Sequence, residues 1–181
     1  MHVFSANGRY VRSFGHVPVV PNPMVREFIS GGILSPARNG GIWYTQNAPY
    51  LIERYSSDGT LEVQIQRPND FLPSAESALR IEVSGERTTY SVPAPFARAA
   101  AIQELDDGTV LNQVLLPTQR VVTDVFKQDS KGAWALIGSY LHAGPVLVRR
   151  AGDGMFLSLV TSEGMRFGGV MLVRYTPRAR P

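Results

Sequence analysis

Hydrophobic residues along this chain fall into short β-branched and aromatic runs, and turn residues interrupt these runs every few positions. Three of the runs end in an aromatic residue and lead through a glycine turn into a second run, with the turn glycines at Gly8, Gly59 and Gly132. Asn-Gly and Asp-Gly turns supply the positive φ that tight hairpins require. The pattern therefore predicts a series of antiparallel β-hairpins.

The longest candidate helix covers residues 96–105, which are rich in alanine. Ten residues are marginal for a helix on its own, and this segment follows Pro93 and Pro95 and ends at Asp107-Gly108. The chain also has 17 Gly and 13 Pro, which suits many tight turns. We therefore expect a strand at 96–105 and an all-β chain.

The turns and strands repeat along the chain. A second set of turns, at Gly40, Gly108 and Gly154, comes before apolar runs. The aromatic residues that close the third strand of each unit recur about every 50 residues once a candidate insertion between Phe71 and Pro95 is left out. The closing aromatics are Phe4, Tyr55, Phe126 and Tyr175. Four strands per unit of this length are typical of β-propeller blades.

This repeat predicts that the whole chain, 1–181, is a single domain, a partial β-propeller of about three four-stranded antiparallel blades. The parts are a half blade at 1–15, a blade at 16–68, an inserted hairpin or linker at 69–95, a blade at 96–141 and an incomplete last blade at 142–181.

Residues 3–15, which read VFSANGRYVRSFG, resemble the third-strand, turn and fourth-strand unit of NHL-repeat blades. Residues 121–175 are similar to the closing blades of TolB-like six-bladed β-propellers. The resemblance implies that the chain corresponds to the C-terminal half of such a ring, and that full-length relatives are periplasmic or secreted. It implies a fold and no particular activity, because propellers serve as binding platforms, structural modules and enzymes.

A ring of about six blades is larger than this chain, and three explanations remain open. The chain is the C-terminal half of a longer ring, a half-propeller that pairs with a second copy completing the ring, or a small closed barrel or sandwich with the same rhythm. We also expect residues 10–14 to fill the free edge of the last blade, either within the chain or from a partner.

Composition narrows the classes of function. With 181 residues and 44% hydrophobic residues, the chain can form a core. The lack of cysteine excludes a disulfide scaffold, a thiolate zinc site and a cysteine nucleophile. The net charge is only +3, and the basic residues are scattered, so we expect no nucleic-acid partner. No apolar run reaches the roughly 20 residues of a transmembrane segment, and the N-terminus lacks a signal-peptide pattern.

Motifs for catalysis are missing. The three histidines, His2, His16 and His142, have no metal-binding spacing, and neither a nucleophile elbow nor a P-loop occurs. A lactonase-type propeller would need carboxylates and asparagine around an axial metal. Residues of the right type are Glu27, Asn112, Asp124 and Asp153, but no spacing makes them converge. We therefore expect no catalytic residue, no metal and no cofactor.

Three groups of residues are candidates for binding. Trp43, Tyr44 and Tyr50 either line a carbohydrate or peptide groove or pack in a blade core. Arg80 and Arg87 lie on the hairpin predicted at 79–92, which is either a partner-recognition element or an ordinary long loop.

The third candidate is His142, in a Gly-Pro loop at a ring face, where ligands bind. We expect a non-enzymatic binding or scaffolding module with a protein or peptide partner. The alternatives are a metal-dependent lyase or lactonase of propeller type and a truncated remnant of a longer propeller.

Overall fold

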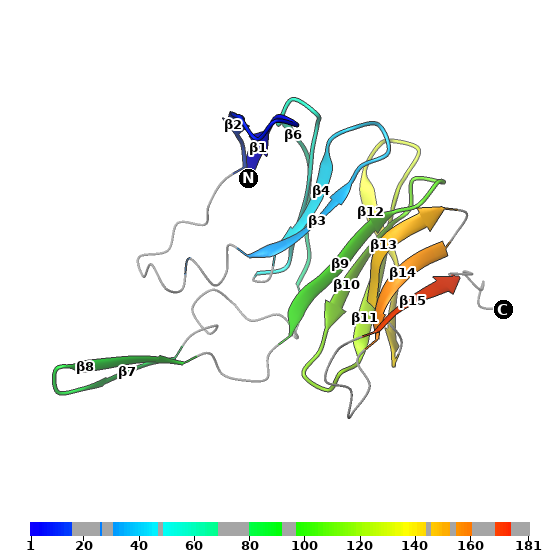
Figure 1. Ribbon diagram of the computed structural model, residues 1–181. Coiled ribbons are helices and arrows are strands. Elements are labelled where there is room, and N and C mark those ends of the chain that lie inside the picture. Colours follow the sequence, from blue (N-terminus) through cyan, green and yellow to red (C-terminus); the bar gives the residue numbers. More distant parts are fainter. Residues whose placement is uncertain are drawn as a thin grey trace.

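The computed structural model describes residues 1–15, 26, 31–46, 49–68, 80–91, 97–143, 146–152, 155–160 and 169–174, and these contain fifteen β-strands (Figure 1). The first eight strands are β1 His2–Phe4, β2 Tyr10–Ser13, β3 Gly32–Pro36, β4 Ile42–Gln46, β5 Leu51–Tyr55, β6 Leu61–Gln66, β7 Arg80–Ser84 and β8 Arg87–Ser91. The others are β9 Arg98–Glu104, β10 Val110–Leu115, β11 Val121–Gln128, β12 Trp134–His142, β13 Val146–Gly152, β14 Met155–Val160 and β15 Gly169–Arg174.

The strands form antiparallel sheets in which neighbours in sequence are neighbours in space. Two sheets have four strands, in the orders β3-β4-β5-β6 and β12-β11-β10-β9, and a third has the order β13-β14-β15. β1-β2 and β7-β8 are two-stranded hairpins. The expectation of an all-β chain with four-stranded antiparallel sheets is confirmed, and the alanine-rich segment forms strand β9 as predicted.

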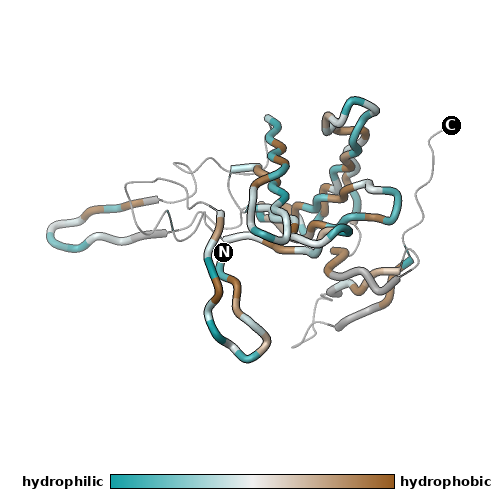
Figure 2. The backbone as a smooth tube through the Cα atoms, turned by 90° about the horizontal axis from the view of Figure 1, so that it is seen from above, coloured by the Kyte–Doolittle hydropathy of each residue, from teal (hydrophilic) through white to brown (hydrophobic). Residues whose placement is uncertain are grey.

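The three larger sheets stand side by side, with β9 running along β3 and β4 on one side and along β13 on the other (Figures 1 and 2). The first strand of each sheet thus lies nearest to the first strand of the next. This arrangement is compatible with a partial propeller.

Apolar side chains fill the space between neighbouring sheets. One core cluster lies between β3–β6 and β9–β12, and its members are Ala37, Trp43, Tyr50, Ile52, Ile65, Ala97, Ile102, Val110, Val114, Val122 and Phe126. A smaller cluster joins Leu111 and Val125 to Leu147 and Phe156 of the third sheet. Because successive residues of a strand point to opposite faces, Val110 and Leu111 serve different clusters.

Polar contacts also link the first strands of the three sheets. The Ser35 hydroxyl of β3 donates to Gln103 Oε1 of β9 at 3.4 Å, and Gln103 Nε2 donates to the Val148 carbonyl of β13 at 2.8 Å. Gln103 is buried, so one amide side chain connects all three sheets through its two ends.

The predicted hairpin turns are confirmed. Gly8, Gly59 and Gly132 have φ values of 81°, 86° and 86°, and they connect β1 to β2, β5 to β6 and β11 to β12. The positive φ is the conformation that the Asn-Gly and Asp-Gly pattern predicted.

The expectation that residues 10–14 fill the free edge of the last sheet within the chain is wrong, while pairing with the edge of a partner stays a prediction. In the described structure, β2 pairs with β1, in a sheet separate from β15. The hairpin instead packs beside the β5–β6 turn, where the Phe14 ring lies 5.2 Å from the Tyr55 ring and the Arg12 guanidinium donates to the Ser57 carbonyl. This aromatic contact and hydrogen bond hold the segment against the first sheet.

No helix in the part of the chain that the structure describes is long and apolar enough to cross a membrane.

Replacing Gly41 by alanine should destabilise the fold strongly. Gly41 has a φ of +81°, and a Cβ atom there would lie 2.1 Å from the Tyr55 carbonyl oxygen. Gly108→Ala is the matched control, because Gly108 has a φ of +78° and open space around a Cβ. We expect Gly108→Ala to lower the free energy of unfolding by about 1 kcal/mol through φ alone, and Gly41→Ala by about 3 kcal/mol or more. Urea denaturation measures both, and equal losses would contradict the clash.

Candidate functional site

A cluster of polar side chains lies inside the apolar contact between sheets β3–β6 and β9–β12. Asn112 of β10 and Asp124 of β11 are directly opposite each other in the sheet. Tyr50 comes just before β5, and Arg67 follows β6. The cluster therefore takes two residues from each sheet.

Hydrogen bonds join all four side chains. The Tyr50 hydroxyl donates to Asp124 Oδ2 at 2.7 Å, and Asn112 Nδ2 donates to the Tyr50 oxygen at 3.0 Å. Arg67 Nη1 donates to Asp124 Oδ1 at 3.0 Å, and its guanidinium lies 5.6 Å from the centre of the Tyr50 ring. The Asp124 side chain is 0% exposed and that of Arg67 is 22% exposed, so the carboxylate is paired in the interior and Arg67 connects it to solvent.

The position of each proton follows from these contacts. Burial and the neighbouring Asp124 raise the pKa of the Tyr50 hydroxyl, which therefore keeps its proton and donates it to the carboxylate. Tyr50 has one proton to give, so Asn112 must turn its NH₂ toward Tyr50.

This orientation leaves Asn112 Oδ1, which is buried, without a hydrogen-bond donor in the described structure. A buried carbonyl without a donor costs about 1–3 kcal/mol. Asn112 Oδ1 is thus the atom of the cluster that can accept a hydrogen bond from water or from a neutral or cationic ligand.

Two of the four residues considered for a metal site come together here. No spacing along the chain predicts that Asn112 and Asp124 converge, yet strand pairing places them side by side. Both oxygens of Asp124 are already bound by Tyr50 and Arg67. Glu27 and Asp153 lie outside the described residues, and among those described no group of three His, Cys, Asp or Glu side chains could hold a metal ion.

The three aromatic candidates do not share one surface. Trp43 is 0% exposed, its Nε1 donates to Glu104 Oε2 at 2.8 Å, and its ring meets Trp134 edge-on at 5.3 Å. For Trp43 and Tyr50 the structure thus shows the core-packing alternative rather than an open groove.

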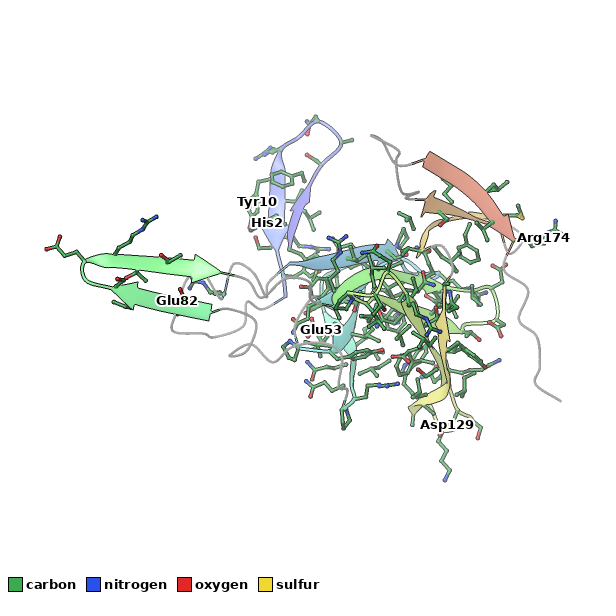
Figure 3. The ribbon with its side chains drawn as sticks, turned by 90° about the horizontal axis from the view of Figure 1, so that it is seen from below. His2, Tyr10, Glu53, Glu82, Asp129 and Arg174 are labelled. Carbon is green, nitrogen blue, oxygen red and sulfur yellow. The ribbon has the colours of Figure 1, made fainter. Side chains whose placement is uncertain are left out.

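Tyr44 belongs to the opposite face of the same sheet. This half-buried tyrosine pairs with Glu53 of the neighbouring strand β5. Glu53 is buried and is labelled in Figure 3. Glu53 accepts hydrogen bonds from the Tyr55 hydroxyl at 2.8 Å and from Gln64 Nε2 at 3.1 Å. Neighbouring aromatic residues of a strand cannot line one groove, because they alternate between the two faces.

His142 ends strand β12, and the expectation of a loop at this residue is wrong. It pairs with Val121 at the start of β11, and its Nε2 lies 2.7 Å from the Thr123 hydroxyl. The ladder between β11 and β12 extends further than the Gly-Pro pattern after His142 suggested. His142 therefore belongs to the face of the sheet that packs on β13–β15.

His142 lies at the end of a chain of hydrogen bonds that begins at the Leu147 N–H. The Leu147 N–H donates to Gln113 Oε1 at 2.6 Å, so Gln113 Nε2 donates to the Thr123 oxygen at 2.9 Å. The Thr123 hydroxyl still has its own proton, which it can donate to His142 Nε2 in the tautomer that carries its hydrogen on Nδ1. Burial, and to a smaller extent the charge of Arg120, lowers the pKa of His142.

The predicted hairpin forms as β7–β8 and extends away from the sheets (Figures 1 and 3). Residues 81–89 are all exposed, Arg87 among them, and Arg80 begins β7 at the base of the hairpin. Ile81 and Val83 face the same side, opposite Tyr90 and Thr88 in the ladder, while Glu82 and Thr89 form a pair on the other side.

No family model, no curated protein and no solved structure matches this chain.

Removing the Tyr50 hydroxyl should destabilise the fold measurably. In Tyr50→Phe, Asp124 Oδ2 and Asn112 Nδ2 lose their partner in a buried position, so we expect the free energy of unfolding to fall by about 2 kcal/mol. Tyr10→Phe is the control, because Tyr10 is exposed, and it should change this free energy by less than about 0.5 kcal/mol. Chemical denaturation compares the two, and a neutral Tyr50→Phe would contradict the network.

Acid should weaken the fold through His142. Its pKa is lower in the folded state than in the unfolded chain, so protonation favours unfolding as the pH falls below the ordinary histidine pKa of about 6.5. We expect His142→Gln, which does not titrate, to lose less stability than the wild type between about pH 8 and pH 5. His2→Gln, at an exposed position, is the control and should follow the wild type. Parallel pH profiles of wild type and His142→Gln would contradict this role.

Proposed function

We propose that this chain is a non-enzymatic protein-binding or scaffolding module, built as a partial NHL-like propeller, in which the β7–β8 hairpin recognises a protein partner. The sheets supply the rigid part of this module, and the hairpin supplies the contact surface.

The observation that carries the proposal is an uncovered apolar face on the hairpin. Ile81 is 47% exposed and Val83 is 71% exposed, and both lie on the same face. The opposite face carries Glu82 and Thr89. The hairpin therefore has its two exposed aliphatic residues on one face, as a strand pair does when that face is to be covered.

An isolated two-stranded hairpin in water is at best marginally stable, because it buries little apolar surface. A partner that covers Ile81 and Val83 would remove that surface from water and stabilise the hairpin. Charged residues of both signs are close to this face along the chain. Glu82 and Glu86 are negative, and Arg87 is positive. The partner surface that fits is a shallow apolar groove with mixed charges at its rim.

The two faces of the hairpin allow a matched experiment. A photo-crosslinking amino acid placed at Val83 in the cells that make this protein should capture the partner on irradiation, because Val83 lies on the apolar face. The same amino acid at Thr89, on the polar face of the same hairpin, is the control. The adducts are identified by mass spectrometry, and binding of the purified partner is then compared for Val83→Asp and Thr89→Asp.

We expect Val83→Asp to weaken this binding by at least about tenfold and Thr89→Asp to leave it nearly unchanged. Thermal unfolding of both variants should match the wild type, since both positions are exposed. Equal crosslinking at the two positions, or none at Val83, would contradict the proposal.

A further inference from the structure

We infer that strand β12 pairs in antiparallel fashion with β12 of a second copy of this chain, so that two sheets β9–β12 join edge to edge in a symmetric dimer. This surface is separate from the β7–β8 hairpin, and the inference does not depend on the function proposed above.

β12 is the outer strand of its sheet and, with nine residues, the longest strand in the described structure. Its sequence, WALIGSYLH, has no acidic residue, no lysine or arginine and no proline. Large apolar side chains along it are exposed, namely Leu136, Ile137, Tyr140 and Leu141. A long, uncharged outer strand with unpaired backbone groups on its outer side is a template for another strand.

The outer strand of the other four-stranded sheet provides an internal comparison. β6 reads LEVQIQ, and its exposed Glu62 forms an ion pair with Arg54. Charged side chains on an outer strand oppose the approach of a second strand, because pairing would desolvate them. β6 has this protection and β12 lacks it, although both strands occupy the same place in their sheets.

A β-bulge limits where a second strand can pair regularly. Gly138 pairs with Val125 and Leu136 pairs with Phe126, so Ile137 is an extra residue in β12. From 138 to 142 the ladder with β11 is regular. This five-residue stretch, beyond the bulge, is the part of the edge where a new ladder can form without interruption.

The regular stretch is complementary to itself. A two-fold axis at Tyr140 places Tyr140 opposite its counterpart and Ser139 opposite Leu141 of the second copy. No like charges meet, since the stretch carries none, and aromatic cross-strand pairs stabilise antiparallel sheets.

A second copy is the occupant that this edge fits best. The partner edge must be uncharged and regular over the same length, and each copy of the chain presents such an edge. Pairing of β12 with β12 uses the same surface on both copies and closes after two, whereas pairing of β12 with a different edge of the next copy would build a larger ring or an open chain.

Light scattering coupled to size-exclusion chromatography, over a series of protein concentrations, tests the inference on the full chain. We expect the wild type to elute with the mass of a dimer as concentration rises. Tyr140→Lys should reduce the mass to that of the monomer, because two ammonium groups would meet at the axis. Leu141→Lys, on the opposite face of the regular stretch, should do the same, because pairing would desolvate its ammonium group opposite Ser139. Two variants are used because the Tyr140 ring also packs over Gly138.

Ala135→Lys is the matched control on the same strand. Ala135 is exposed and lies before the bulge, beyond the part that pairs about Tyr140, so this variant should remain a dimer. Circular dichroism spectra of all variants should match that of the wild type, which shows that each variant is folded. A wild type that is monomeric at every concentration, or a dimer that persists in both Tyr140→Lys and Leu141→Lys, would overturn the inference.

Discussion

The structure depends on burying both faces of the middle sheet. Every residue of β10 from Val110 to Val114 is buried, and so are the first six residues of β11. Both faces of these two strands are therefore shielded from water. The sheet β3–β6 covers one face and β13–β15 covers the other. A single sheet could not satisfy such strands, which explains why the chain arranges three sheets in succession around β9.

Polar groups on the same two strands make this burial specific. On one face, Asn112 and Asp124 bind Tyr50 from the neighbouring sheet. On the other face, Gln113 and Thr123 form a chain of hydrogen bonds that reaches the Leu147 N–H. A shift of one residue in either strand would exchange the two networks and leave buried polar groups without partners. The apolar contacts drive the sheets together, and these hydrogen bonds select one register.

Local features of the fold could be predicted from the sequence, and contacts between distant strands could not. Gly8, Gly59 and Gly132 identified their hairpins because a positive φ is a property of a few adjacent residues. The meeting of Asn112 with Asp124 depends on the register of two strands, which the sequence alone left open.

The questions that the sequence left open, and the predictions that were wrong, have the same origin. For Trp43 the sequence left a groove and core packing open, and the alternation along β4, which puts Trp43 and Tyr44 on different faces, decides for the core. His142 looked like a loop residue because the Gly-Pro pattern marks a turn, while the ladder with β11 continues up to it. The N-terminal hairpin packs against Tyr55 and not along the last sheet. Its contact there joins Phe14 to a residue far along the chain, and no pattern of adjacent residues predicts such a contact.

The position of the β7–β8 hairpin in the chain has a consequence for synthesis on the ribosome. Sheet β3–β6 is complete before β9 emerges, and the hairpin with its flanking residues lies between the two. Until translation passes this segment, the apolar side of Trp43 and Ile52 has no sheet to pack against. The nascent chain thus spends this interval in a state that chaperones recognise, and every residue inserted between β6 and β9 prolongs that interval.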